Sequence, residues 1–487
     1  MNDSENTTLH KIATFLINNR YGIVALFILI TIGMIYSMSN LRIETGFKKQ
    51  LPLKHEYMQT FLQYEKEFGG ANRVLVALVA RDGNMFTPEF FESFETITDQ
   101  VFFIPGVDRA SVRSIFTPNV RFVEIVEDGF AGGNVIPSDY APSPEMFEQV
   151  RSNIVKSGEV GRLVSADFSG AMVWANLLEE NPQTGEKLDY RSVADQLEAI
   201  RTQFEGEEFT VHIIGFAKIV GDISDGARAV GWFFLIALFI TAVLLYLYSK
   251  SVWLTVLPLV CSLVAVIWQM GTLSLMGYSL DPMNILTPFL IFAIGVSHGV
   301  QKISAWRVEK EFGGHTPDYW LARGVKSLDD VPRRSPMHGS RETIKKLLAP
   351  GVIALVSDTI GFLTILFINI RIIQELAITA SIGVAVIIVT NLLLLPVLLS
   401  WVKLKNPDAY RTRMMRNAAK KSPIFEFLAD FTEPKRAAWA IAVSIALFAV
   451  GLYLAQGMKI GDSEVGVPEL RPDARYNQDA LLISERF

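Results

Sequence analysis

Residues 21–38 read YGIVALFILITIGMIYSM, an apolar run that leads into Leu41-Arg42-Ile43. A similar run, AAWAIAVSIALFAVGLYL at 437–454, leads into Met458-Lys459-Ile460. Internal repeats of this kind are common in secondary transporters. The chain therefore reads as the first half of a two-part membrane protein followed by the beginning of a second half. In this interpretation, 457–487 starts a second extracytoplasmic domain.

Seven segments are apolar over about the 20 residues that a helix needs to cross a bilayer. They are 21–38, 229–248, 252–276, 284–300, 349–370, 372–401 and 437–454. The first segment follows Lys11 and Arg20 and has small residues near its end, so a cleaved secretory signal is an alternative. Its length and its likeness to 437–454 favour a retained membrane anchor.

Charge in the connecting segments predicts the orientation of the spans. The 301–348 and 402–436 segments are rich in Lys and Arg, which places them and the N-terminal residues 1–20 in the cytoplasm. Segment 41–228 falls on the opposite side and is acidic. We therefore expect a multi-pass membrane protein, with a five-helix bundle at 229–401 and a large extracytoplasmic domain at 41–228.

The 41–228 segment has the pattern of a mixed α+β domain. A strand is predicted at 72–80 and a helix from Thr87-Pro88-Glu89, which combines a capping residue with proline and an early acid. Further elements are predicted as a strand at 110–116, a hairpin across 162–177, a helix at 189–204 and a strand at 209–214. This order suggests ferredoxin-like βαβ units. The stretch 118–144, rich in Gly and Pro, reads as a loop.

Composition excludes several classes of function. The net charge is -5 and the sequence pI is about 5.8, which gives no sign of nucleic-acid binding. Cys261 is the only cysteine, so no disulfide can form within the chain. The six histidines do not combine with acids at metal-ligand spacing, and no glycine-rich phosphate loop occurs. We therefore expect no enzyme activity, no metal and no cofactor, and ATP is not the expected energy source.

The order of these parts resembles the resistance–nodulation–division (RND) superfamily of transporters, and in particular its MMPL-like branch of predicted exporters. Four local motifs are similar to recurring motifs of that family: Pro105-Gly106-Val107, Val112-Arg113-Ser114, Ile360-Gly361-Phe362-Leu363 and Leu395-Pro396-Val397-Leu398-Leu399. The resemblance covers nearly the whole chain. It implies proton-driven export of hydrophobic or lipid-like molecules, with a proton gradient as the energy source. It also implies a location in the bacterial inner membrane, with the 41–228 domain in the periplasm.

The fourth span departs from the family pattern. Proton-coupled members of the family often carry Gly-x-Asp-Tyr there, whereas this chain reads Gly295-Val296-Ser297-His298. Ser297 thus stands in the place of the aspartate and His298 in the place of the tyrosine. This departure favours an alternative function, a sterol-sensing-like membrane sensor or assembly factor without proton-coupled flux, because the five-span cluster also resembles Patched-like proteins.

Two ionisable residues stand out within the predicted spans, where charge is costly. His298 changes charge near neutral pH, and burial can bring an aspartate such as Asp358 into the same range. His298, Asp358 and Ser297 are the predicted proton relay. Gly295 and Gly361 are predicted to allow close helix contact. The alternatives are that His298 packs against a carbonyl or meets water at the cytoplasmic rim, and that Asp358 is a structural hydrogen-bond partner.

Two further acidic positions have simpler explanations. Asp281-Pro282 is expected to cap the fourth span, and Arg371 and Glu375 are expected to form an interfacial ion pair. The expected partners are the membrane, a hydrophobic small molecule or lipid, and either a second-half polypeptide or further copies of the chain. The sequence assigns no substrate-binding residues.

Overall fold

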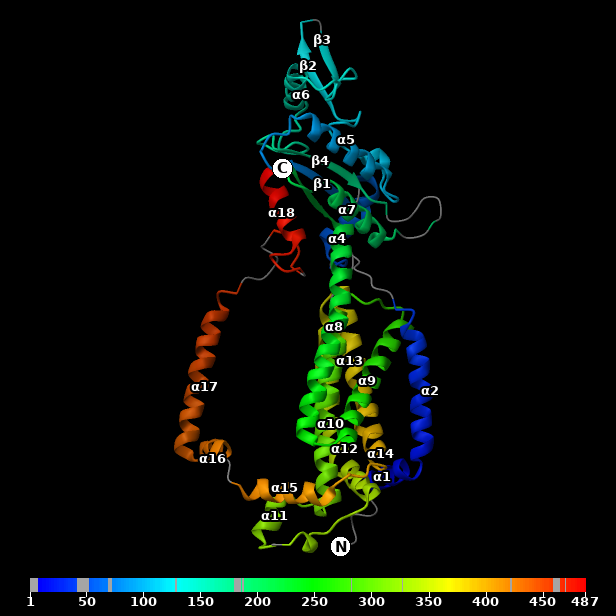
Figure 1. The fold of residues 1–487 in the computed structure, drawn as a ribbon, viewed down its shortest axis with the longest axis vertical. Coiled ribbons are helices and arrows are strands. Elements are labelled where there is room, and N and C mark those ends of the chain that lie inside the picture. The colour runs from blue at the N-terminus through cyan, green and yellow to red at the C-terminus, as the bar shows by residue number, and fades with distance from the viewer. Residues whose placement is uncertain are drawn as a thin grey trace. The chain divides into compact units, whose positions relative to one another are not determined.

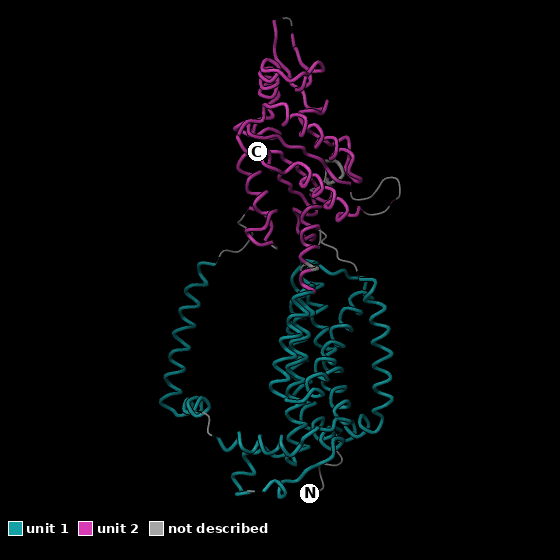
Figure 2. The backbone as a smooth tube through the Cα atoms, viewed as in Figure 1, with its two compact units in different colours: residues 1–42, 232–461 teal, residues 43–231, 462–487 magenta. Residues whose placement is uncertain are grey.

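The computed structural model describes residues 8–41, 52–68, 72–127, 129–178, 185, 188–281, 283–325, 327–420, 423–458, 465–468 and 470–487. The chain forms two compact units, which Figure 2 distinguishes by colour. Residues 1–42 and 232–461 form the membrane unit, and residues 43–231 and 462–487 form the α/β unit. The α/β unit therefore contains 462–487, which the sequence analysis assigned to a second domain.

Helices make up the membrane unit, labelled in Figure 1. Its helices are α1 (Thr8–Asn18), α2 (Arg20–Met38), the second part of α8 (Phe216–Ser249), α9 (Val252–Leu275), α10 (Thr287–Phe312), α11 (Pro317–Ala322), α12 (Pro336–Thr364), α13 (Arg371–Ile387), α14 (Leu395–Leu399), α15 (Pro407–Ala419), α16 (Pro423–Ala429) and α17 (Pro434–Ala455). Short 3₁₀ turns occupy Asn284–Leu286 (η2), Leu328–Asp330 (η3), Ile365–Phe367 (η4) and Asp430–Thr432 (η6), and Ile388–Leu394 (η5) is π-helical.

In the described part of the chain, 7 helical segments are long and apolar enough to cross a membrane. They coincide with the seven predicted spans, and two are longer than predicted. Helix α10 continues to Phe312 and α12 already begins at Pro336, so the helices extend into the predicted 301–348 loop. Tertiary packing explains the extension, because Trp306 and Phe312 of α10 are buried although the residues around them are charged.

Helix α2 is held against α9 by polar contacts as well as by apolar ones. The Ser37 hydroxyl donates to the carbonyl oxygen of Gly271 over 2.8 Å, and the Trp268 indole donates to the Thr31 hydroxyl over 2.9 Å. Phe27 stacks on the Trp268 ring. Within lipid such hydrogen bonds and close contacts drive helix association, because burial of apolar surface supplies little.

The α/β unit has helices and strands that alternate along the chain (Figure 1). They are α4 (Glu56–Phe68), β1 (Arg73–Ala80), α5 (Pro88–Phe103), η1 (Arg109–Ser111), β2 (Arg121–Val126), β3 (Gly129–Asn134), α6 (Pro144–Ser157), β4 (Gly170–Asn176), α7 (Tyr190–Phe204), β5 (Phe209–Gly215), the first part of α8, and α18 (Arg475–Arg486).

Strands β4, β1 and β5 form a sheet in that order, and both pairs are antiparallel. In a ferredoxin-like domain two split βαβ units interleave, so neighbouring strands of its four-stranded sheet are antiparallel. The pairing observed here is compatible with that arrangement, but the sheet in the described residues has three strands, so the expected ferredoxin-like topology is not confirmed. The mixed helix and strand composition agrees with the sequence analysis, as do the strand at 72–80 and the helix from Thr87, whose hydroxyl caps α5 by accepting from the Phe90 amide.

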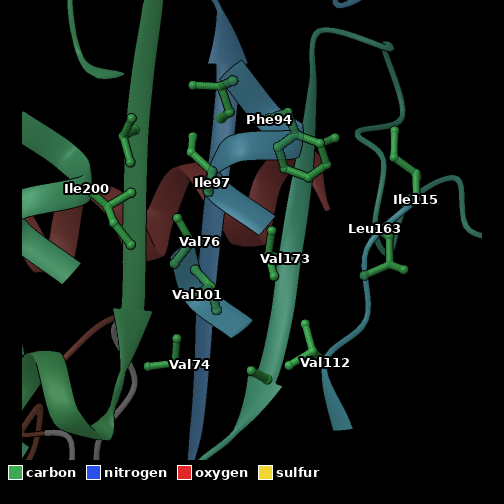
Figure 3. Packing of buried hydrophobic residues seen from close by; sticks show 14 of the residues in the cluster. Val74, Val76, Phe94, Ile97, Val101, Val112, Ile115, Leu163, Val173 and Ile200 are labelled. Atoms are coloured by element: carbon green, nitrogen blue, oxygen red, sulfur yellow. The ribbon is translucent and has the colours of Figure 1, made fainter. Parts of the chain in front are cut away.

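Both faces of the sheet are covered. Alternate residues of β1 point to opposite faces, so Val74 and Val76 pack under α5 and α7, whereas Leu75 and Ala77 face the other side. Figure 3 shows the first side, where Phe94, Ile97, Val101 and Ile200 surround Val74, Val76 and Val173. On the second side Ile483 of α18 and Phe487, the residue after this helix, complete the small cluster.

Two sequence predictions in this unit are wrong. The expected strand at 110–116 is largely irregular, because Asp108 accepts from the Ala110 amide and starts the 3₁₀ turn η1. The expected loop at 118–144 contains the hairpin of β2 and β3, in which Ile125 pairs with Phe130. The glycines of β3 concealed the hairpin, since glycine is uncommon in strands.

A buried carboxylate fixes α18 to the sheet. Asp479 accepts hydrogen bonds from Arg201 (2.7 Å), His212 (2.8 Å), the Ile213 amide (3.1 Å) and Arg475 (3.0 Å). Burial alone would raise the pKa of Asp479, but the His212 hydrogen bond and the charge of Arg201 outweigh it and hold the pKa below its ordinary value. The contact between α18 and the sheet therefore includes specific hydrogen bonds to Asp479 as well as apolar packing.

Candidate functional site in the membrane unit

Helix α10 carries the predicted relay residues of the fourth span on two different sides. Ser297 is exposed and His298 is half-buried. One turn later Lys302 is only 2% exposed, and its Nζ has no hydrogen-bond partner among the described residues. The burial of Lys302 shows that it does not mark an exposed rim of the helix, whereas the half-exposed His298 remains open to water.

Asp358 lies on the exposed side of α12 and not in a helix contact. It has no hydrogen bond or ion pair in the described part of the chain, and Ala354, Ser357 and Gly361 on the same helical face are exposed too. The prediction that Gly361 permits close helix contact is wrong here, since a Cβ on it would meet nothing within 4 Å. We call these four α12 residues the polar stripe.

His298 lies within electrostatic range of Asp358. The charged groups that act on the imidazole are Lys302, from its own helix, and Asp358, from α12. The structure thus brings His298 under the influence of both groups, while Ser297 lies on the exposed side near them. His298, Lys302 and Asp358 are thus three ionisable groups within the spans that can take up or release a proton or respond to its charge.

Gly295 marks the closest helix approach near the site. A Cβ on Gly295 would lie 2.7 Å from Ser262 Oγ of α9 and 3.1 Å from Asn391 Nδ2 of the π-helical segment. Ser262 in turn donates to Asn391 Oδ1 over 3.4 Å, and both side chains are fully buried. π-Helical turns inside α-helices are frequent at functional sites. This polar contact joins three helices beside His298, and the sequence analysis did not identify Ser262 or Asn391.

A second polar cluster lies where α9 gives way to α10. Asp281 accepts from the Met283 and Asn284 amides and from Asn284 Nδ2 over 2.7–2.9 Å. Thr287 donates to the Asn284 carbonyl oxygen (2.7 Å) and accepts from Gln269 Nε2 (2.6 Å). The expected capping role of Asp281 is thus present, but the buried cluster of Asp281, Asn284, Thr287 and Gln269, here called the oxygen cluster, was not predicted.

Comparison with known proteins gives two matches. The family model of the Patched sterol-sensing domain matches residues 231–313, which run from α8 to the end of α10. A Methanocaldococcus jannaschii protein named as a candidate membrane protein is 19% identical over 406 residues, which is 80% of this chain and 93% of that protein. These matches support an RND- or Patched-like family. They do not distinguish the MMPL-like branch.

The matched region locates part of the candidate site. Residues 231–313 include Ser297, His298, Lys302 and the oxygen cluster, whereas Asp358 lies outside them. With seven apolar helical segments, the comparisons support a multi-pass membrane protein. The oxygen cluster and the groups around His298 are therefore the parts of the site that lie in the family-like region.

Proposed function

We propose that the protein is a proton-driven exporter of hydrophobic or lipid-like molecules from the MMPL-like branch, and not an enzyme. The observation that carries this proposal is a carboxylate on the exposed side of a membrane-spanning helix, with a histidine in electrostatic range. A charged side chain within a span costs about 2.5–3.5 kcal/mol on insertion scales. Such a residue is retained where it serves an ion pathway or meets a polar partner.

In this proposal protonation controls what the polar stripe can contact. An ionised Asp358 must be solvated by water or contacted by a polar group. That group can belong to the substrate or to a second helical bundle, which a second-half polypeptide or another copy of the chain would supply. A protonated Asp358 can be covered by apolar surface, so proton uptake changes the packing of α12. Ser297 and His298 lie on the route by which the proton would be exchanged. Differential stabilisation of two packings by charge is a sufficient basis for coupling.

Asp358→Asn tests the proton step. We expect the variant to insert and fold normally but to lose gradient-driven export of a fluorescent lipid analogue from proteoliposomes by tenfold or more, because Asn cannot exchange a proton. The matched control is Asp318→Asn on α11, where the same change affects an exposed carboxylate outside the polar stripe. Normal export by Asp358→Asn would rule out the proposed proton site.

The alternative is a sterol-sensing-like sensor or assembly factor. The specific support for it is the Patched match, which covers 231–313 and contains Ser297-His298 in place of Asp-Tyr. The same proteoliposomes separate the two functions. Binding of the lipid analogue that is unchanged by a pH gradient, without any flux, would favour the sensor.

A further inference from the structure

The oxygen cluster contains two acceptors that nothing in the described chain satisfies. Gln269 is 1% exposed and Asn284 is 0% exposed, yet Gln269 Oε1 and Asn284 Oδ1 have no hydrogen-bond partner among the described residues. Leaving such an atom buried and unpaired costs about 1–3 kcal/mol. Two of them in one cluster therefore require a donor or a cation.

The orientations of both amides are fixed by their nitrogen atoms. Asn284 Nδ2 donates to Asp281 Oδ2, so Oδ1 is the atom left over. The Thr287 hydroxyl uses its proton on the Asn284 carbonyl oxygen and must accept from Gln269, which leaves Gln269 Oε1 unpaired. Exchanging oxygen and nitrogen in either amide would break these bonds. The unpaired atoms are therefore oxygens.

Charge in the cluster is also uncompensated. Asp281 is 2% exposed and forms no ion pair with a basic side chain in the described residues. Burial raises the pKa of Asp281 and the charge of Glu375 adds to this rise, although three N–H donors oppose it. Glu375 itself is paired with Arg371 at 3.0 Å. One carboxylate without a counter-ion thus lies beside two unpaired amide oxygens.

We propose that the oxygen cluster binds a monovalent alkali cation, with Na⁺ as the expected ion. Asp281 supplies the charge, and Gln269 Oε1, Asn284 Oδ1 and the Thr287 hydroxyl supply neutral oxygens, the ligands that hard cations prefer. The single negative charge of the Asp281 carboxylate balances the single positive charge of the cation.

The sequence predicts no metal site of the kind that histidine, cysteine and acidic clusters form. In the part of the chain that the structure describes, no three His, Cys, Asp or Glu side chains lie close enough to hold a metal ion. The proposed site differs in kind, since three of its four ligands are amide or hydroxyl groups. It does not depend on proton-driven export, and its test requires no gradient and no substrate.

Binding of ²²Na⁺ to the purified full-length chain in detergent tests the proposal. With choline chloride at matched ionic strength, we expect saturable binding of about one Na⁺ per chain and a thermal midpoint that rises with the logarithm of Na⁺ concentration. Choline alone should produce neither effect. Absence of saturable binding to the folded wild-type protein would overturn the proposal.

Variants locate the site. Asp281→Asn and Gln269→Leu should each weaken Na⁺ binding by tenfold or more, whereas Gln301→Leu, the same change at an exposed position of α10, should not alter it. If Gln269→Leu does not fold, Gln269→Glu retains the ligand oxygens and should change the affinity for Na⁺ in the folded protein. Wild-type binding in Asp281→Asn and in either Gln269 variant would place the ion elsewhere and refute the assignment.

Discussion

Substitution of Lys302 distinguishes an effect of this residue on stability from an effect on export. Its ammonium group is buried without a hydrogen-bond partner in the described structure, which opposes folding. Lys302→Met keeps the length of the side chain and removes the charge. We therefore expect the variant to raise the free energy of unfolding by about 1–4 kcal/mol, as when buried charge is replaced by apolar groups, while export falls.

Thermal unfolding and proteoliposome export of the same preparation measure both effects. Lys405→Met, at an exposed position, is the matched control and should change neither. A destabilised Lys302→Met protein would mean that the ammonium group has a partner, and stability gained with normal export would remove Lys302 from the mechanism.

Asp479 is the residue on which the α18 contact depends. Asp479→Ala should lower the free energy of local opening of α18 by about 3–5 kcal/mol, because Arg201 and His212 then remain buried without their acceptor. Hydrogen exchange of α18 amides measures it, with exposed Asp473→Ala as the control. Retention of wild-type protection in Asp479→Ala would show that apolar packing alone holds the helix.

The same residue gives α18 a pH dependence of known sign. The pKa of Asp479 is lowered in the folded state, so its stabilisation is fully present above the unfolded value of about 3.9 and is lost as pH falls through the folded pKa. Protection of α18 should therefore decrease below about pH 4 in the wild type. Asp479→Asn should show a smaller acid-dependent decrease, because the pKa values of Glu205 and Asp167, which pair with Arg475 and Arg486 of α18, are also lowered.

At the scale of elements, the sequence predicts the apolar spans that lie in lipid. It does not predict the helix ends and polar clusters that tertiary contacts determine. All seven spans follow from apolar runs. The ends of α10 and α12 do not, because residues such as Trp306 are buried by other segments and not by lipid. The oxygen cluster was not predicted either, because it too depends on contacts between different helices. Asp281 reads as a helix cap, and only the fold adds Gln269 from a different helix.

The structure also extends the repeat that the sequence suggested. Helix α4 begins at Glu56 and α18 at Arg475, each after one of the two similar spans. Both read Tyr-x-Gln-x-x-Leu from their second residue, and a Phe ends α4 at Phe68 and directly follows α18 at Phe487. The longer match strengthens the interpretation of two related halves, since it includes the helix that follows the span as well as the span itself.

At the scale of the molecule, orientation in the membrane is the remaining prediction from sequence. Basic segments should lie in the cytoplasm and the α/β unit on the opposite side. Glu89→Cys on α5 and Asp318→Cys on α11 are exposed single substitutions, and the native Cys261 is buried. An impermeant maleimide should label Glu89→Cys in cells whose outer barrier is opened, but Asp318→Cys only after the inner membrane is permeabilised. The wild-type protein should remain unlabelled in both conditions. Equal labelling of both variants before permeabilisation would mean that α5 and α11 lie on one side, and the arrangement of the seven spans proposed here would be wrong.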